Sequence, residues 1–312
     1  MKTFHILNLG AGVQSTALAL MFDAGEIKDE NGDSITLTAA YFADTGDEPQ
    51  AVYRHLEWIQ ATIKTFPIHV RSKGRLSDDL SRGVNSTGQR FASIPAFTNV
   101  DGGLAKDVGR TRRQCSREYK IEVIEAAIKS EILALSPGRR LTKEMRVVQY
   151  LGISMDEIGR AVRVMRGRAG TKDRDAAKSW PYHKLIEYQK TLRWCNAFPL
   201  VEMDVTRGMC LQYLAGRVPH ETPRSACVQC PYHSDAEWLK IKSVSEDWAL
   251  AVQVDRSLRI PGNIVNRNMD QKLYLHRSCQ PLELVVFNPK PSIRETQLSM
   301  SFAGECEGVC GV

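Results

Sequence analysis

The stretch GAGVQST (residues 10–16) has the residue types of a phosphate-binding loop. It follows a short apolar run and leads into small and apolar helix formers. Glycines at positions 10 and 12 are expected to allow positive φ and a close approach of the backbone to a phosphate. Hydroxyl and amide side chains follow in the first helical turn, whose N–H groups have no partner within the helix. The candidate phosphate-binding residues are Gly10, Ala11, Gly12, Gln14, Ser15 and Thr16.

Other kinds of phosphate loop fit this stretch less well. A Walker loop requires a lysine after its last glycine, and this stretch has none, which excludes that loop. A dinucleotide-binding fingerprint requires a third glycine three positions after Gly12, where Ser15 stands instead. In that alternative, Asp44 would bind the ribose from the end of the next strand.

Cysteines are the second group of reactive side chains. The chain has eight cysteines, and since no secretory signal is evident, we expect reduced thiols for metal or redox chemistry instead of a disulfide framework. Cys227 and Cys230 form a C-x-x-C pair followed by proline. This spacing suits a redox disulfide, half of a zinc site or half of an iron–sulfur site. Cys115 and Cys210 are the candidates for further ligands.

The hydrophobic pattern predicts the elements that hold these residues. Strands are expected at residues 4–9, 35–42, 67–71, 146–152 and 197–202, and helices at residues 15–22, 48–65 and 117–135. Alternating strands and helices are typical of a three-layer, parallel, Rossmann-like α/β sheet. Residues 72–113 lack clean periodicity and predict a long insertion near the active face. We expect a nucleotide-binding domain over residues 1–205 and a mostly helical, cysteine-bearing region over residues 206–312.

Four stretches together resemble one superfamily. GAGVQST is similar to its Ser-Gly-Gly-x-Asp-Ser loop, with Gln14 in the place of the aspartate. FADTGDEPQAVYRHLEWI (residues 42–59) carries an Asp-Thr-Gly element after the second strand, and YLGISMDEIGR (residues 150–160) carries a Gly-Ile-x-x-x-Glu-x-x-Arg element. CSREYKI (residues 115–121) is similar to its cysteine–basic helix start. Over about two thirds of its length, the chain resembles the PP-loop ATP pyrophosphatases, in the branch of the phosphoadenosine phosphosulfate (PAPS) reductases.

The resemblance implies that ATP or another adenine nucleotide binds at the loop, with Asp44, Thr45 and Gly46 beside it. Asp44 can orient a sugar hydroxyl or a metal-bound water, and Arg160 can bind phosphate oxygens with two nitrogens. The simpler alternatives are that Asp44 caps the following helix and that Arg160 lies on the surface. At position 14 an amide replaces the carboxylate that would bind Mg²⁺ better.

The resemblance also implies roles for the cysteines. Several relatives hold a [4Fe–4S] cluster with a C-x-x-C pair and an upstream cysteine, and zinc is the alternative metal. The expected ligands are Cys115, Cys210, Cys227 and Cys230. The tail ECEGVCGV is similar to the C-terminal Glu-Cys-Gly of PAPS reductases, which implies that Cys306 or Cys310 is a nucleophile on a mobile tail. The alternative is an inert tail.

Basic residues are concentrated in two segments. The net charge of +6 fits an anionic ligand or nucleic acid but requires neither. Residues 158–178 hold seven basic and two acidic residues, and RTRRQCSR (residues 110–117) is a second basic run. These segments are expected either to face tRNA or DNA or to be a solvated charged surface.

Three functions are therefore predicted as alternatives. The first, which the basic segments and the single cysteine at position 115 favour, is ATP-dependent sulfur transfer to, or modification of, a nucleic-acid base. In it ATP adenylates a carbonyl oxygen, and a thiolate or a cluster-bound sulfide displaces AMP. The second is a sulfonucleotide reductase whose tail cysteine attacks the sulfate group and whose cycle thioredoxin completes. The third is a non-catalytic module that senses a nucleotide or cluster, for which Gln14 is the best support.

The sequence contains no membrane or secretion signal that we can identify. No apolar run approaches the roughly 20 residues of a membrane span. The N-terminal apolar stretch is too short for a signal peptide and leads straight into the glycine loop. We expect a cytoplasmic location and no membrane partner.

Overall fold

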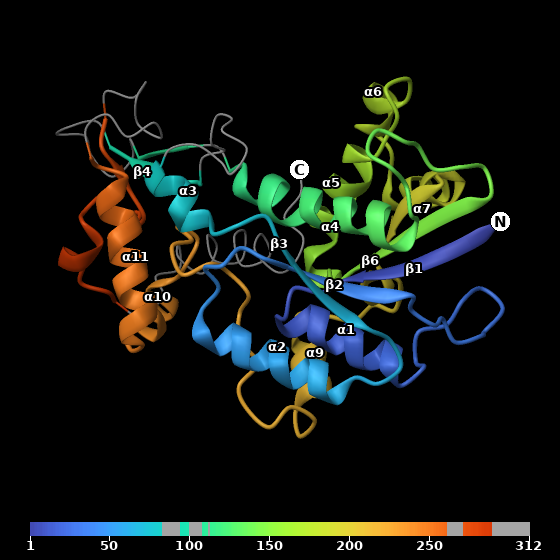
Figure 1. The fold of residues 1–312 in the computed structure, drawn as a ribbon, viewed down its shortest axis with the longest axis horizontal. Coiled ribbons are helices and arrows are strands. Elements are labelled where there is room, and N and C mark those ends of the chain that lie inside the picture. The colour runs from blue at the N-terminus through green and yellow to red at the C-terminus, as the bar shows by residue number, and fades with distance from the viewer. Residues whose placement is uncertain (83–93, 100–107, 112, 261–270, 289–312) are drawn as a thin grey trace.

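The central element of the molecule is a parallel sheet. The computed structural model describes residues 1–82, 94–99, 108–111, 113–260 and 271–288. In this part of the chain a five-stranded sheet has the order β3-β2-β1-β6-β7, with every pair parallel (Figure 1). Its strands are β1 (Lys2–Asn8), β2 (Ala39–Asp44), β3 (Ile68–Ser72), β6 (Met145–Leu151) and β7 (Trp194–Ala197). The predicted three-layer α/β fold is confirmed.

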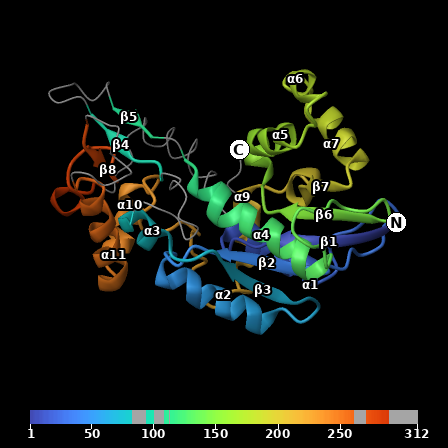
Figure 2. The same cartoon turned by 45° about the horizontal axis from the view of Figure 1, so that its top comes forward.

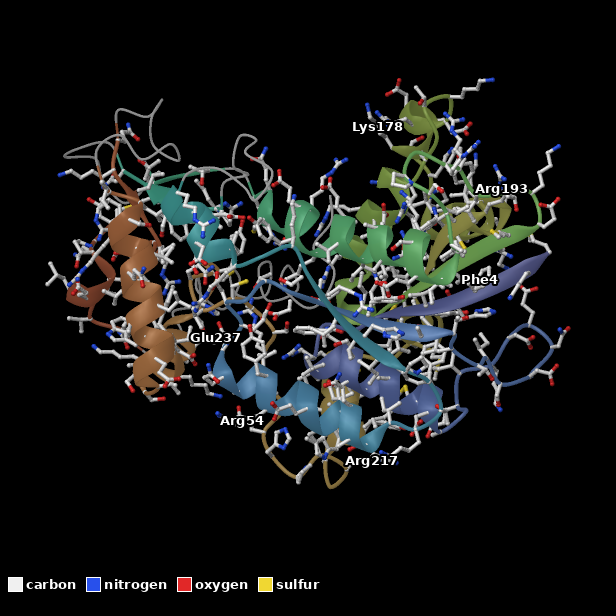
Figure 3. All side chains as sticks on the ribbon, in the orientation of Figure 1. Phe4, Arg54, Lys178, Arg193, Arg217 and Glu237 are labelled. Atoms are coloured by element: carbon white, nitrogen blue, oxygen red, sulfur yellow. The ribbon has the colours of Figure 1, made fainter. Side chains whose placement is uncertain are left out.

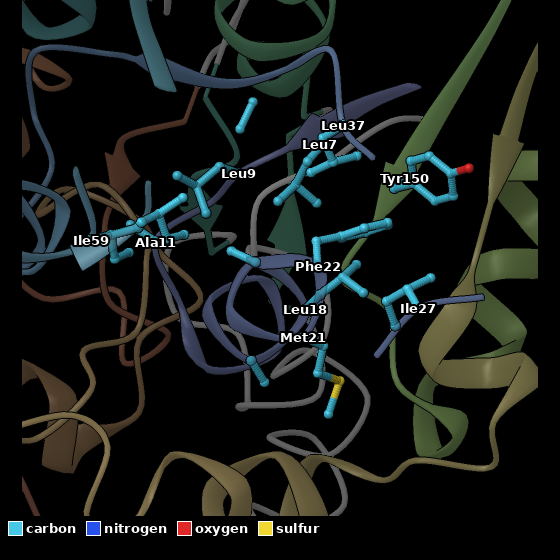
Figure 4. Packing of buried hydrophobic residues seen from close by; sticks show 14 of the residues in the cluster. Leu7, Leu9, Ala11, Leu18, Met21, Phe22, Ile27, Leu37, Ile59 and Tyr150 are labelled. Carbon is cyan, nitrogen blue, oxygen red and sulfur yellow. The ribbon is translucent and has the colours of Figure 1, made fainter. Parts of the chain in front are cut away.

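The side chains of the strands point alternately to the two faces of the sheet, and helices cover both faces. On one face, Leu7 and Phe42 pack with α1 (Val13–Asp23), α2 (Gln50–Thr62) and α9 (Arg207–Leu214) (Figure 4). On the other face, Ile6 and Tyr41 pack with the helical segment 117–132. That segment contains α4 (Glu122–Ala127) between the π-helical turns η2 (Arg117–Ile121) and η3 (Ile128–Ile132). Buried strands with apolar residues on both faces are typical of parallel sheets.

A third group of helices covers the end of β6. α5 (Ile158–Gly167), α6 (Arg174–Ala177) and α7 (Tyr182–Thr191) surround a cluster that contains Leu151, Ile153 and Phe198. A 3-10 turn, η4 (Met155–Glu157), joins β6 to α5. This cluster fixes the start of α5 beside the sheet.

A smaller unit lies beyond the carboxyl ends of the strands, as Figures 1 and 2 both show. It contains α3 (Leu76–Arg82), α10 (Asp235–Lys242), α11 (Ser245–Ser257), the 3-10 turn η5 (Leu282–Leu284) and a small antiparallel sheet. That sheet has the order β5-β4-β8, formed by β5 (Gly109–Arg110), β4 (Phe97–Thr98) and β8 (Leu273–Tyr274). One hydrophobic cluster joins Leu76 and Tyr119 to Trp238 and Leu258. The predicted insertion and the C-terminal region thus share a core, whereas α9 packs on α1.

Two predicted strands have different bounds in the structure. Residues 197–202 were expected to be a strand, but the strand ends at Ala197 and Pro199–Glu202 form the short helix α8. Proline explains the change, because it has no N–H for a sheet ladder and suits the first turn of a helix. The strand expected at residues 35–42 begins only at Ala39, because Ile35 donates its N–H to Ile27 instead.

None of the helices in the described ranges has the length and apolar character that crossing a lipid bilayer requires.

Candidate active site

The order of the strands makes a topological switch point between β1 and β6. The chain runs outward from β1 through β2 to β3 and then returns to β6 on the other side of β1. In open α/β sheets, ligands bind at such a switch point, outside the carboxyl ends of the strands. The glycine loop follows β1 and residues 152–157 follow β6, so two of the four family-like stretches meet there.

The glycine loop itself is tightly built. Ala11 is the residue with left-handed backbone, at φ 55°, and Gly12 has φ −106°. The expectation of positive φ at the two glycines is therefore wrong, and the turn out of β1 takes its one left-handed residue between them. Ser15 Oγ lies 3.2 Å from both the N and the O of Gly12. The Ser15 hydroxyl thus closes the loop from inside.

Gly152 brings the loop after β6 against the start of α1. A Cβ on Gly152 would lie 2.7 Å from the backbone N of Ser15 and 2.8 Å from its Cα. Contacts below 3.0 Å with backbone atoms do not occur in relaxed structures. The glycine at this position is therefore required by close packing of the two loops.

Gln14 holds the same two loops together with its side chain. Its Nε2 donates to Ser154 Oγ at 3.1 Å and to Glu157 Oε2 at 2.9 Å. Its Oε1 accepts from Arg207 Nη1 at 2.9 Å. Gln14 is fully buried. Both polar ends of its side-chain amide are hydrogen-bonded to other residues of the protein.

Arg160 is also part of this network. It is only 7% exposed, and its Nη1 lies 3.4 Å from Glu157 Oε2. The alternative that Arg160 is a surface residue is wrong. The structure thus brings Gln14 and Arg160 to one carboxylate, that of Glu157.

Asp44 shapes the turn after β2. Its Oδ1 accepts from the Gly46 N–H at 2.8 Å and from Tyr53 Oη at 2.8 Å. Gly46 has φ +74°, and a Cβ there would meet Arg75 Cγ at 2.9 Å. α2 begins later, at Gln50, after Pro49, so Asp44 caps the turn and not the helix.

Thr16 is linked to a pair of histidines. Its Oγ1 lies 3.0 Å from His55 Nε2, and His55 Nδ1 lies 2.8 Å from His220 Nε2. Burial, together with the charge of His220, lowers the pKa of His55 to about 4. His55 is therefore neutral at pH 7, and it fixes the Thr16 side chain in the core.

Three of the candidate cysteines line one cavity. Cys115, Cys227 and Cys230 are in its wall, together with Thr45, Lys120 and Arg113. The cavity has a volume of about 40 Å³, enough for a few waters. We call it the thiol cavity. Its thiols come from the helix start at residue 115 and from the turn at residues 227–230.

Thr45 of the Asp-Thr-Gly element is part of the wall of the thiol cavity. Thr45 Oγ1 lies 3.1 Å from Cys227 Sγ. The next two residues extend the connection, since Asp47 Oδ2 accepts from Gln229 Nε2 at 2.7 Å and Glu48 Oε1 accepts from Lys120 Nζ at 2.9 Å. The edge of the sheet where β2 ends is therefore continuous with the C-x-x-C turn.

The environment of Cys227 favours the protonated thiol. Desolvation, and secondarily the carboxylate of Glu48, raise the pKa of Cys227 well above its usual value. A bound cation would reverse this preference, because coordination to a metal deprotonates a thiol. Without such a cation, Cys227 is a poor thiolate nucleophile.

Among the described candidate cysteines, Cys210 is not part of the thiol cavity. Cys210 is fully buried in α9, in the cluster between α1 and the sheet, so the structure does not gather it with the other three. Its helical position, four residues after the Thr206 cap, points it into the apolar face. Cys306 and Cys310 lie outside the described residues.

The basic side chains of the two segments have different partners in the fold. In residues 158–178, Arg168 bonds Glu125 and Gln149, and Arg166 donates to the Trp180 carbonyl. Lys178 is exposed at α6, away from the sheet (Figure 3). In residues 110–117, by contrast, the guanidinium groups of Arg110 and Arg113 lie 5.1 and 5.6 Å from the centre of the Tyr232 ring. The second segment therefore places its charge next to the thiol cavity.

The structure also adds residues that sequence reasoning missed. Ser154 and Arg207 contact Gln14, His55 contacts Thr16, and Glu48 pairs with Lys120. Glu48 stood in the quoted Asp-Thr-Gly stretch, and its position next to that motif was an available signal. Arg207 lies in no recognised stretch, so only its position in the fold connects it to the loop.

The donors in the thiol cavity have the chemistry that soft metals prefer. Thiolates select zinc and iron–sulfur clusters, and a largely apolar wall protects such sites from water. Among the described residues, no three His, Cys, Asp or Glu side chains are grouped closely enough to hold a metal ion as they stand. The three thiols fit the expected ligand type, and binding would require them to close around the ion.

Comparison with known proteins adds no relative. No family model matches the chain, and neither the curated proteins nor the solved structures include a significant match.

Proposed function

We propose that this chain is a PP-loop enzyme that binds an adenine nucleotide at the switch point and transfers sulfur to, or otherwise modifies, a nucleic-acid base. The observation that carries the proposal is the 3.1 Å contact between Thr45 and Cys227. Thr45 belongs to the element that the resemblance places beside the nucleotide, and Cys227 belongs to the thiol cavity. A ligand at the edge of β2 would therefore lie next to the thiols.

Three loops at one edge of the sheet support the proposal that a nucleotide binds there. The glycine loop, the turn after β2 and the loop after β6 all follow the carboxyl ends of neighbouring strands. Backbone N–H groups at the start of α1 suit phosphate oxygens, and Arg160 adds positive charge from the start of α5. The order and spacing of these parts agree with the PP-loop resemblance.

The sulfur half is supported by the thiol cavity. Cys115, Cys227 and Cys230 are the residues that would hold a [4Fe–4S] cluster, or zinc as the alternative, and Cys210 is not among them. A cluster held by three cysteines would supply an open iron site at which a sulfur donor could bind. Arg113 in the same wall would attract an anionic sulfur species such as hydrosulfide.

The position of two arginines supports the proposal that nucleic acid is the substrate. Arg110, which is exposed, and Arg113, which is half-buried, lie against the buried ring of Tyr232 beside the cavity. Guanidinium groups suit the phosphates of nucleic acid and stack on the planes of unpaired bases. We therefore propose tRNA or DNA as the substrate class, approaching over these two arginines.

The proposed reaction has two balanced steps. A carbonyl oxygen of the base attacks the α-phosphorus of ATP, and pyrophosphate leaves. Hydrosulfide then attacks the activated carbon, the C–O bond breaks and AMP leaves with the oxygen, while the sulfur loses its proton and stays on the base as a thiocarbonyl. The protein's part is to orient the phosphates, to exclude water from the cavity and to bring the sulfur within reach.

The test uses the full chain purified without oxygen. Iron and zinc content, the absorbance band near about 400 nm expected of a cluster, and pyrophosphate release from ATP with tRNA, DNA or neither are measured. The proposal expects bound metal and pyrophosphate release that depends on nucleic acid. Metal-free protein that releases no pyrophosphate with any nucleic acid would contradict it.

Two further assays distinguish the alternatives. Sulfite release from phosphoadenosine phosphosulfate in the presence of thioredoxin would identify a sulfonucleotide reductase. Nucleotide binding without turnover would favour a sensing module, an outcome to which the fully engaged Gln14 amide lends support.

A further inference from the structure

Arg207 is fixed at the junction of three segments that are far apart in the sequence. Its backbone N–H donates to Asp156 Oδ1 at 2.9 Å, and the neighbouring Met155 N–H donates to Val205 O at 2.8 Å. Its Nη1 donates to Gln14 Oε1 at 2.9 Å. The start of α9 is therefore tied both to the turn after β6 and to the glycine loop.

Gln14 is chemically suited to orient this guanidinium. An amide donates with its nitrogen and accepts with its oxygen, so it can bind the Glu157 carboxylate at one end and Arg207 at the other. A carboxylate at position 14 would have no donor for Glu157. The amide oxygen is also neutral, so it accepts from the guanidinium without forming an ion pair with it.

The bond to Gln14 places the Arg207 guanidinium near the start of α1, the end of the helix that carries the candidate phosphate loop. Gln14 is the second residue of α1, directly after the Gly10–Gly12 turn. Arg160 reaches the same network through Glu157. The Gln14–Glu157 pair thus contacts two guanidinium groups, one from α5 and one from α9.

We propose that Arg207 is a phosphate-positioning residue, which presents positive charge to the phosphate chain of the ligand over the glycine loop. The inference rests on the proposed nucleotide site and adds to it a residue from α9 that no motif contains. The class of ligand it selects is a nucleoside di- or triphosphate, in preference to a monophosphate or a nucleoside. A charge-assisted bond to phosphate stabilises a complex by about 1.5–3 kcal/mol, which corresponds to roughly 10- to 150-fold in affinity.

The experiment measures binding of ATP, AMP, adenosine and inorganic pyrophosphate by calorimetry to the full chain. The variants are Arg207→Ala, Arg207→Lys and the control Arg217→Ala. Arg217 is an exposed arginine just after the same helix, stacked 4.2 Å from the Tyr213 ring centre (Figure 3). Thermal unfolding of each variant shows whether it is folded.

The expected result depends on phosphate number. Arg207→Ala weakens the binding of ATP and of pyrophosphate at least tenfold, weakens the binding of AMP less and leaves the binding of adenosine unchanged. Arg217→Ala changes none of these affinities. Arg207→Lys keeps the charge but not the two-nitrogen geometry, so it lies between wild type and Arg207→Ala and decides the question if the alanine variant does not fold. The affinity for ATP is also expected to depend less steeply on salt concentration in Arg207→Ala than in the wild type. A purely structural defect would not cause this change.

The outcomes separate the two proposals. ATP and pyrophosphate binding that is equal in wild type and Arg207 variants overturns the role of Arg207 and leaves the nucleotide site standing. Pyrophosphate binding that requires Arg207, without any preference for an adenine ligand, supports the inference and contradicts the proposed function. Wild-type protein that binds none of the four ligands overturns both.

Discussion

Thr45 and Cys227 are 182 residues apart in the sequence, yet Thr45 Oγ1 lies 3.1 Å from Cys227 Sγ. The contact joins the end of β2 to the C-x-x-C turn. Around it, Asp47 bonds Gln229 and Glu48 pairs with Lys120. Because these bonds are buried, the thiol cavity and the end of the sheet are expected to behave as one unit.

Removal of single cysteines is expected to separate metal ligands from core thiols. Cys227→Ala, Cys230→Ala and Cys115→Ala should each lose most of the iron or zinc that the wild type binds, because each removes a thiol from the cavity. Cys210→Ala should keep the metal and lose only about 1 kcal/mol of stability, the cost of a small void in the core. Metal analysis after anaerobic purification measures the difference. Loss of metal in Cys210→Ala with retention in Cys115→Ala would refute this assignment.

Gly152→Ala is expected to displace the glycine loop. The new Cβ would lie 2.7 Å from the Ser15 backbone N, and backbone atoms cannot move aside as a flexible side chain can. We expect a loss of about 1–3 kcal/mol in the free energy of unfolding, the usual range for overpacking. Gly159→Ala is the matched control, because a Cβ at Gly159 meets nothing within 4 Å. Urea unfolding measures both, and equal stability of the two variants would contradict the close packing.

Gln14→Glu is expected to make stability depend on pH. The substitution replaces the Nε2 donor 2.9 Å from Glu157 Oε2 by a second carboxylate oxygen. Two adjacent carboxylates repel each other unless they share a proton, so the pKa of the pair should be raised. The variant should therefore be less stable than wild type at pH 8, by roughly 1–3 kcal/mol, and should recover part of the difference at pH 5. A stability difference that is the same at both pH values would show that the pair does not interact.

Two buried histidines are expected to destabilise the fold in acid. Burial lowers the pKa of both His55 and His233 to about 4, whereas an unfolded histidine has a pKa near 6.5. Between these values the unfolded chain binds more protons than the folded chain, so the free energy of unfolding falls as pH falls from about 6.5 to about 4. At pH 5 the loss is at most about 2 kcal/mol per histidine.

The variant His55→Gln tests this effect. It should reduce the difference in stability between pH 7.5 and pH 5, because glutamine does not titrate. His183→Gln, at an exposed histidine of α7, should leave that difference unchanged. If both variants keep the pH dependence of the wild type, His55 does not contribute to it.

The Glu237 carboxylate should act at lower pH. Arg224 and His233 lower its pKa to about 2 in spite of its burial, and Figure 3 shows Glu237 on the side of α10 that faces the sheet. Its contribution is fully present above the unfolded pKa near 4.3 and is lost as pH falls toward 2. Glu237→Gln should therefore reduce the loss of stability between pH 4.5 and pH 3 in urea unfolding. An unchanged acid limb in that variant would argue against the pair with Arg224.

The sequence by itself determined the layered fold and the edge where a ligand would bind. Apolar strands alternating with helices require a parallel sheet covered on both faces, and such a sheet gathers the loops after its strands at one edge. For that reason the glycine loop, the Asp44–Gly46 turn and the Gly152–Arg160 stretch could be expected near one another. The apolar pattern alone did not predict every element correctly. The run that contains Pro199 resembled a strand but forms a short helix.

Only the tertiary structure decided which side chains meet. C-x-x-C spacing identified Cys227 and Cys230 as a pair, and both Cys115 and Cys210 were expected to join them. The packing of α9 on α1 buries Cys210 in the sheet core, whereas the segment at residue 115 packs with the C-terminal unit. Gln14 looked like a missing metal ligand, and in the fold it is the amide that joins Glu157 to Arg207. Contacts of this kind depend on where helices far apart in sequence are docked, which residue type and spacing along one segment do not encode.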